Sequence, residues 1–287
     1  MKVSFYGVRG CIPSPGAEFN RYGGNTMCVT VEGEAGELLV LDAGTGVIEL
    51  GKRLMAGAFG RGEGEASLFL THAHWDHIQG FPFFVPVYVP GNHIQVFGPN
   101  SSPQMLESIL EGQMNPHFMP IQSLGNLGAN IELRSLMADE GVSVGALKVC
   151  AHSVPHGTME SLALKIEEGD TRVVFVPDAG YEADALEPSL RSFYQGADLL
   201  IHDTTYTSED RATRISRGYA SAEIAASVAA QCGVRCLVPI HYDQDYTDEQ
   251  VDALVERCRE VLDSSPGGAS VDLVAAKESL VLDVPQK

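Results

Sequence analysis

Residues 71–80, THAHWDHIQG, decide how the rest of the chain is interpreted, because four potential metal ligands crowd into six positions directly after an apolar run. Residues two apart in an extended segment point to the same side, so His72 and His74 can bind one cation together. Asp76 and His77, around the turn that follows, can face a second cation. Imidazole nitrogens and a carboxylate oxygen suit zinc, or less selectively manganese or iron. The segment therefore predicts a site for two metal ions.

A histidine-rich surface loop is the alternative interpretation of this segment, since isolated histidines are usually structural or solvated. The whole chain contains nine histidines, and three of them fall here beside an aspartate. Such a concentration favours metal binding. A site for two ions still requires ligands from other parts of the chain.

Short β-rich runs alternate with helical stretches on both sides of this segment. Upstream we expect strands at 3–8, 27–32 and 37–44 and a helix at 47–57. Downstream we expect strands at 94–99, 142–154, 160–169, 171–180, 198–206, 236–243, 270–276 and 279–284, and helices at 103–114, 221–233 and 247–263. Both halves have the same plan, mostly strands with helices outside. Because no linker or repeat separates them, we expect one domain, residues 1–287.

The stretch that follows residue 113 shows no clear periodicity up to residue 128. It carries Met114, His117, Phe118 and Met119. Apolar residues in such a segment can cover a pocket, and they can equally pack as core.

The composition is typical of a soluble globular protein. Of the 287 residues 44% are hydrophobic, and the mean hydropathy is near zero. We find no export signal and no run of about 18 apolar residues that would span a membrane, so we expect no membrane association. Six cysteines spread over the chain favour reduced, buried thiols over a disulfide framework. We therefore expect a cytoplasmic protein.

The formal net charge of −19 bears on the partners of the chain. Such a charge repels phosphate polymers at long range, although bound metal ions would offset part of it locally. We find no basic patch in the sequence. The charge therefore predicts a small anionic substrate and no long nucleic acid.

Taken together, the motifs resemble the metallo-β-lactamase fold superfamily of hydrolases, whose signature is H-x-H-x-D-H after a strand. The chain is similar to the ribonuclease Z-like and cyclic-phosphodiesterase branch, because GVRGCIPSPG (7–16), RYGGNT (21–26) and LLVLDAGTG (38–46) precede the motif in this order. The resemblance implies an α/β fold, an αββα sandwich of two mixed β-sheets with outer helices. It also implies two divalent metal ions, zinc first, with manganese or iron as alternatives.

The same resemblance implies where the remaining ligands lie. His156 fits the third histidine of the first metal site, Asp178 fits the carboxylate that bridges both metals, and His241 fits the last ligand of the second site. The implied set is His72, His74 and His156 for the first ion, Asp76, His77 and His241 for the second, and Asp178 between them.

Each of these three assignments has an alternative. His156 can be a turn residue, Asp178 can cap the helix that follows it, and His241 can be a strand-end histidine bonded to Asp243. His152 competes with His156 for the place of the ligand. We prefer His156, because the family places its ligand in the loop before the next strand.

The resemblance extends to residues with catalytic roles. Asp76 corresponds to an aspartate that orients the attacking water. His202 and Asp203, in LIHDTTY, correspond to a His-acidic-Ala-Thr element and would form a pair near the metals, although Asp203 and Thr204 can instead cap a turn. Tyr219 stands where relatives carry the histidine of Gly-His-Ser-Thr. It can donate a hydrogen bond, but its ordinary pKa is too high for proton release at neutral pH.

The implied function is hydrolysis by a hydroxide that two metals make available at neutral pH. Our first hypothesis is a phosphodiesterase for a small cyclic phosphodiester, either a cyclic nucleotide or a phosphoribosyl cyclic phosphate. No long glycine- and lysine-rich arm that could hold tRNA is present, so we do not expect ribonuclease Z activity. The alternatives are a thioester or lactone hydrolase and a relative that binds nucleotides without catalysis. Relatives are often dimers, which makes a homodimer plausible.

Four further residues could line the site. Trp75 lies between candidate ligands, and its side chain could form one wall of the metal site, although packing is the commoner role of tryptophan. Arg9, Arg21 and Asn25 belong to early loops that the family folds near the metals, where they could contact a phosphate. Ion pairing or exposure to solvent is the alternative for both arginines.

Overall fold

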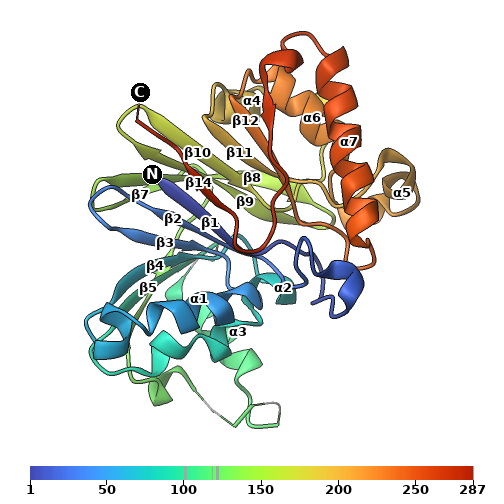
Figure 1. Cartoon of the computed structure of the whole chain (residues 1–287). Coiled ribbons are helices and arrows are strands. Elements are labelled where there is room, and N and C mark those ends of the chain that lie inside the picture. The colour runs from blue at the N-terminus through green and yellow to red at the C-terminus, as the bar shows by residue number, and fades with distance from the viewer. Residues whose placement is uncertain (100–101, 118, 121–122, 287) are drawn as a thin grey trace.

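The computed structural model describes residues 1–99, 102–117, 119–120 and 123–286. Within them, two seven-stranded sheets lie face to face (Figure 1). The first sheet contains, in spatial order, β14 (Val281–Asp283), β1 (Lys2–Gly7), β2 (Cys28–Glu32), β3 (Leu38–Leu41), β4 (Glu65–Phe69), β5 (His93–Gly98) and β6 (Asn130–Ser135). The second contains β13 (Asp272–Leu273), β12 (Cys236–Ile240), β11 (Leu199–Asp203), β10 (Thr171–Val176), β9 (Met159–Glu168), β8 (Leu147–His156) and β7 (Gly141–Val144).

Helices cover the outer face of each sheet. On the first sheet lie α1 (Gly46–Leu54) and α3 (Pro103–Gln113), and on the second lie α4 (Pro188–Tyr194), α6 (Ala222–Gln231) and α7 (Asp248–Ser264) (Figure 1). Two short helices, α2 (Trp75–Ile78) and α5 (Ser208–Thr213), lie at one end of the sheets. The 3-10 turns are η1 (Ala17–Phe19), η2 (Ala58–Arg61), η3 (Phe81–Phe83), η4 (Val85–Tyr88), η5 (Leu124–Asn126), η6 (Ala183–Ala185), η7 (Ile215–Arg217) and η8 (Gly268–Ser270).

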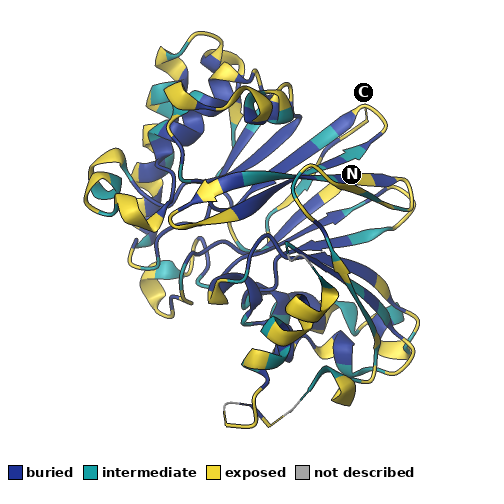
Figure 2. Cartoon of the chain, turned by 180° about the vertical axis from the view of Figure 1, so that it is seen from behind, coloured by how far each residue is buried: buried dark blue, intermediate teal, exposed yellow. Residues whose placement is uncertain are grey.

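Alternation along the strands creates two hydrophobic layers on the first sheet. In β3, Leu39 and Leu41 join the large core between the sheets, whereas Val40 joins a second core under the helices. Successive side chains of a strand point to opposite faces, so one apolar run serves both layers. Figure 2 shows buried strands between helices whose outer faces are exposed. The predicted αββα sandwich is thereby confirmed, and we propose from the shared core that residues 1–287 form one domain.

Both sheets are mixed. The strands β3 to β6 run parallel, as do β10 to β13, and the other neighbours in each sheet are antiparallel. The carboxyl ends of parallel strands meet at one edge of a sheet, where sites usually form in α/β proteins. This arrangement brings the residues after β3, β4, β10 and β12 to the same end of the sandwich.

One sequence prediction of a strand needs correction, and the prediction of a last strand is confirmed. The predicted strand 142–154 is a hairpin of β7 and β8, because Gly145, at φ 57°, turns the chain back on itself. The last strand, β14, pairs antiparallel with β1, so the end of the chain returns to the first sheet. No helix among the described residues has the length and apolar character that crossing a membrane requires.

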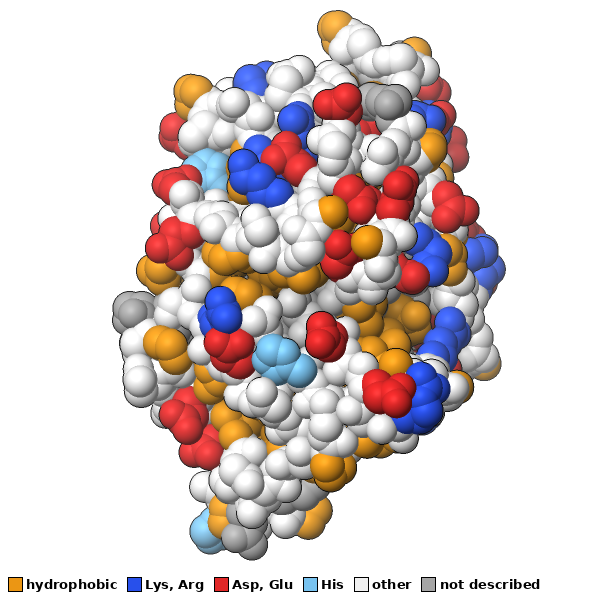
Figure 3. Space-filling view, turned by 90° about the vertical axis from the view of Figure 1, so that its left-hand side faces the viewer, with side chains coloured by type: hydrophobic (Ala, Val, Ile, Leu, Met, Phe, Trp, Pro, Cys, Tyr) orange, Lys and Arg blue, Asp and Glu red, His pale blue; other side chains and the backbone are white. Residues whose placement is uncertain are grey.

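The surface carries charges of both signs. On the face in Figure 3, lysines and arginines are interspersed with aspartates and glutamates, and hydrophobic side chains lie in the hollows between them.

Candidate metal centre

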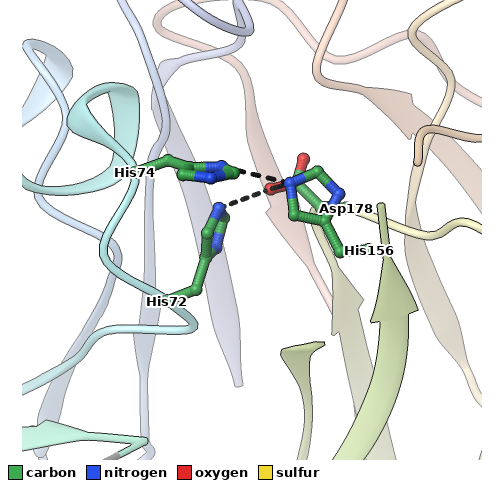
Figure 4. Close-up of side chains that lie close together, drawn as sticks. All are labelled: His72, His74, His156 and Asp178. Atoms are coloured by element: carbon green, nitrogen blue, oxygen red, sulfur yellow. Dashed lines mark hydrogen bonds and ion pairs between the residues drawn. The ribbon is translucent and has the colours of Figure 1, made fainter. Parts of the chain in front are cut away.

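The structure brings all seven predicted ligands together in two adjoining clusters. Within each cluster one nitrogen or oxygen of every residue lies within 4.8 Å of the others. The first cluster contains His72, His74, His156 and Asp178, whose side chains point toward one another in Figure 4. The second contains Asp76, His77 and His241.

Asp178 lies between the clusters. Its Oδ2 is 3.0 Å from Nε2 of His72 and 3.2 Å from Nε2 of His77, and its Oδ1 is 3.0 Å from Nε2 of His241. Burial opposes ionisation of this carboxyl, but His241 and His77 hold its pKa well below the usual range. One carboxylate thus faces ligands of both clusters, which is the geometry that a bridging ligand requires.

The ligands stand at the ends of strands from both sheets. The segment after β4 provides four of them, whereas β8, β10 and β12 each lead to one ligand in the second sheet. His241 has a left-handed backbone, at φ 64°, and packs so closely on Gly10 that a Cβ there would lie 2.2 Å from the imidazole ring. The loop before β2 is therefore fitted to the second cluster.

Unsatisfied polar atoms in the centre fit a metal. Nε2 of His72, Nε2 of His77 and both carboxylate oxygens of Asp178 are buried and have no hydrogen-bond partner among the described residues. Such atoms are rare in folded proteins, because each costs free energy unless something binds it. Burial and the neighbouring His77 lower the pKa of His72 well below its ordinary value, which keeps this ring neutral and able to coordinate. Nitrogen and carboxylate donors suit divalent transition metals.

Hydrogen bonds from outside orient the buried ligand histidines. Asp42 Oδ2 lies 2.7 Å from Nδ1 of His77, and Thr205 Oγ1 lies 2.9 Å from Nδ1 of His241. Thr71 contacts both Asp42 and His72. Its Oγ1 donates a hydrogen bond to Asp42 and lies 3.2 Å from Nδ1 of His72. Such partners fix the ring orientation and the tautomer of metal-binding histidines.

His156 is held in the same way by a backbone carbonyl. Its Nδ1 lies 2.9 Å from the carbonyl oxygen of Gly218. Gly218 has φ 73° and lies so near Gly157 that a Cβ would be 1.8 Å from the nitrogen of Gly157, so only glycine fits here. The competing His152 is not in the cluster and lies 3.0 Å from Asp139.

His202 and Asp203 have different surroundings, although both are fully buried. Asp203 accepts hydrogen bonds from the backbone N–H groups of Ala179 and Ala220 and from the hydroxyl of Thr205, which also contacts His241. It therefore ties together the segments that carry Asp178, Tyr219 and His241. Burial raises its pKa to about 6.

His202 points away from the clusters. Its Nε2 lies 2.5 Å from the hydroxyl oxygen of Tyr181, which lies 3.3 Å from the hydroxyl oxygen of Tyr194. Burial lowers the pKa of His202 to about 4, so the ring is neutral. Among the described residues, the hydrogen-bond partners of its ring are the hydroxyl of Tyr181 and the carbonyl oxygen of Asp203, and neither belongs to a cluster.

Tyr219 covers the centre. Its ring centroid is 5.1 Å from that of His156 and 5.2 Å from that of His241, one from each cluster. Its hydroxyl lies 3.4 Å from Sγ of Cys11, whose backbone N–H donates to Asp76 Oδ2 at 2.6 Å. Burial raises the pKa of Tyr219, which keeps its hydroxyl protonated.

The early-loop residues are engaged elsewhere. Arg9 is fully buried and donates to the carbonyl oxygens of Gly23, Asp243 and Tyr246. Arg21 pairs with Asp252, and Asn25 donates to Glu278. These side chains hold the loop in place. Trp75 is 75% exposed beside the ligands.

Sequence reasoning missed one cation near the centre, Arg217. It is exposed and donates to the hydroxyl of Tyr206 at 3.0 Å, and no ion pair to a carboxylate is found for it within the described ranges. The backbone of 216–217 packs against Gly157, next to His156. Only its position two residues before Tyr219 could have indicated this arginine.

The fold and the site define a metal-dependent hydrolase of the αββα type. Residues 39–242 match the family model described as a beta-lactamase superfamily domain, and the chain belongs to this superfamily. The predicted family and the prediction of a metal-dependent hydrolase are confirmed.

Named proteins are similar in sequence to this chain over much of its length. A protein named Ribonuclease Z from Haloferax volcanii is 25% identical, with 99% of this chain and 95% of that protein covered. Another Ribonuclease Z, from Ignicoccus hospitalis, is 27% identical over 63% of this chain and 71% of that protein.

Solved structures share the fold. YhfI from Bacillus subtilis, a metallo-beta-lactamase fold protein, has a TM-score of 0.69 at 17% identity, with 98% of both chains covered. The short form of human tRNase Z has a TM-score of 0.68 at 18% identity and full coverage of both chains. Zinc-bound PqqB from Methylobacterium extorquens has a TM-score of 0.67 at 14% identity, covering 99% of this chain and 100% of that one.

The comparisons overturn one prediction. We expected no long nucleic acid among the partners, but relatives that match this chain over most of its length are named Ribonuclease Z. The physical reason is that net charge sums over the whole molecule, whereas a nucleic acid meets a local field. Charges of both signs are interspersed on the surface (Figure 3), and bound metals would add positive charge at the site.

Proposed function

We propose that the chain is a phosphodiesterase whose two clusters hold two divalent metal ions. The observation that carries this proposal is Asp178, which faces ligands of both clusters with both of its carboxylate oxygens unsatisfied. Two adjacent metals, when bound, lower the pKa of a water and hold the oxygens of a phosphoryl group. The donor set favours zinc, and the similar fold of zinc-bound PqqB supports this choice.

Four residues of the chain have distinct roles in this proposal. Asp76, fixed by the N–H of Cys11, orients the attacking water through its carboxylate. The hydroxyl of Tyr219 donates a hydrogen bond to an oxygen of the phosphodiester, because the ring covers both clusters and the hydroxyl stays protonated. Arg217 attracts the anionic substrate at the edge of the site. Asp203 acts as a positioning residue through its contacts to the segments of Asp178, Tyr219 and His241.

For the substrate we propose a small cyclic phosphodiester, a cyclic nucleotide or a phosphoribosyl cyclic phosphate. Its support is the resemblance of the motifs to the cyclic-phosphodiesterase branch. A second candidate is a phosphodiester within RNA, which the names of the relatives favour. The spread of six free cysteines supports the cytoplasm as the proposed location.

Turnover of chosen diesters tests the proposal. We would measure hydrolysis of bis-p-nitrophenyl phosphate, a panel of cyclic nucleotides and a precursor tRNA by the zinc-loaded protein. His74→Ala and Asp178→Ala should abolish turnover, whereas His93→Ala, at a histidine that lies near Glu132 instead, should not. Cleavage of thioesters or lactones alone would contradict a phosphodiesterase, and metal binding without any turnover would favour a binding protein.

A further inference from the structure

A pocket adjoins the segment that carries the metal ligands. It has a volume of about 560 Å³ and is lined by Trp75, Phe83, Ile109, Met119, Gln79 and Gln113, among others. Its wall includes Ala73 and Trp75, which alternate with the ligands His72, His74 and Asp76. The metal centre and this pocket are therefore on two sides of one short segment, and Trp75 stands at their common edge.

Two exposed aromatic rings line the pocket. Trp75 is 75% exposed and Phe83 is 51% exposed. Single exposed hydrophobic side chains are common on soluble proteins, but exposed apolar side chains grouped together mark sites for a partner or ligand. The volume falls within the range of small-molecule sites, about 300–1,000 Å³. The pocket is thus suited to a flat, apolar group of moderate size.

One polar atom behind the wall of the pocket lacks a partner. The side chain of Gln113 lines the pocket, and its Nε2 is buried with no hydrogen-bond partner among the described residues. A buried donor without an acceptor costs free energy, which a ligand with an acceptor would recover. Met119, from the stretch predicted to cover a pocket, is part of the wall, whereas Met114 is fully buried and Phe118 lies outside the described residues.

We propose that this pocket binds the heterocyclic base of a nucleotide substrate. The base stacks between Trp75 and Phe83, and the side chain of Gln113 turns so that its amide forms a hydrogen bond with the edge of the base. Base–aromatic stacking accepts every base, and amide side chains pair with base edges. The inference rests on the proposed function, and it narrows the substrate class to phosphodiesters that carry a nucleobase close to the bond that is cleaved.

The fluorescence of Trp75 tests the pocket directly, because the chain contains one tryptophan. We would titrate the zinc-loaded protein with adenosine 5'-monophosphate and, separately, with ribose 5-phosphate, which lacks the base. The proposal predicts saturable quenching by the nucleotide and none by the sugar phosphate. Equal responses to both, or no quenching by the nucleotide, would overturn it.

Variants locate the base within the pocket while Trp75 remains as the probe. Phe83→Ala should weaken nucleotide binding about tenfold or more, and Gln113→Leu should weaken it about threefold to tenfold. The matched controls are Met137→Ala, at an exposed apolar residue outside the pocket, and Gln104→Leu, at an exposed glutamine of the same helix, α3. Wild-type affinity in both pocket variants would contradict the proposal.

The same experiment separates this inference from the proposed function. Base-dependent quenching without hydrolysis of any diester would support the base-binding pocket and contradict the proposed phosphodiesterase activity. Diesters with and without a base could instead be hydrolysed equally fast, with no change in Phe83→Ala. This result would support the phosphodiesterase activity and contradict the base-binding pocket.

Discussion

The two sheets contribute to the metal centre in different ways. The first sheet supplies four candidate ligands from one segment of six residues after β4, whereas the second supplies three single candidate ligands at the ends of β8, β10 and β12. The first set depends on local sequence, and the second depends on the register of three strands that are far apart in the chain. The comparison teaches that a local motif can supply candidate ligands to both clusters, whereas tertiary structure must position the remaining candidate ligands of each cluster.

The largest effect is expected at a ligand of the second sheet. His156→Ala should lower turnover by more than about 100-fold, since even the outer partners of metal ligands are worth 10–100-fold. His152→Ala, on the same strand but facing Asp139, is the matched control and should retain near-wild-type activity. Steady-state kinetics with bis-p-nitrophenyl phosphate measures both. Equal losses of turnover in the two variants would contradict the assignment of His156, and not His152, as a metal ligand.

The next effect concerns the partner of a ligand from the first sheet. Asp42→Asn should weaken metal binding by about 10–100-fold, because it removes the carboxylate that orients His77 through Nδ1. Competition with a chromogenic chelator measures this affinity. Unchanged affinity would mean that the local segment needs no support from β3.

A smaller effect is expected at Tyr219, whose ring covers the two clusters. Tyr219→Phe removes only the hydroxyl and should lower kcat about tenfold, the worth of one hydrogen bond, while the metal content stays the same. Kinetics together with elemental analysis distinguish this from loss of a ligand. A wild-type kcat would exclude the hydroxyl from the reaction.

The smallest effect is expected at the edge of the site. Arg217→Ala should raise KM for an anionic diester about twofold to fivefold with little change in kcat, because an exposed charge contributes modestly. Arg61→Ala, at an exposed arginine paired with Glu63, is the control. An equal change in both variants would show a general effect of net charge.

The fold and the centre could be predicted in part from the sequence. The HAHWDH segment and the alternation of strands and helices are local patterns, and they predicted an α/β chain with helices outside and the first four candidate ligands, whereas the two-sheet sandwich was predicted only through the family resemblance. His156, Asp178 and His241 were predicted only through the order of motifs in a known family, because each is an isolated residue at a strand end.

Other features could not be read from local patterns. The roles of Asp42 and Thr205 depend on which strand ends become neighbours, which only the sheet order decides. The pairing of β14 with β1 joins the two ends of the chain. Net charge was a poor guide to nucleic acids, since it contains no information on where the charges lie.

The number of metal ions per chain tests the central claim most directly. Elemental analysis of the zinc-loaded wild type should give two ions per chain, and Asp178→Ala should lose ions from both clusters, because this carboxylate faces ligands of each. A wild type that holds one ion or none, or an Asp178→Ala variant that keeps two, would contradict a binuclear centre joined by Asp178.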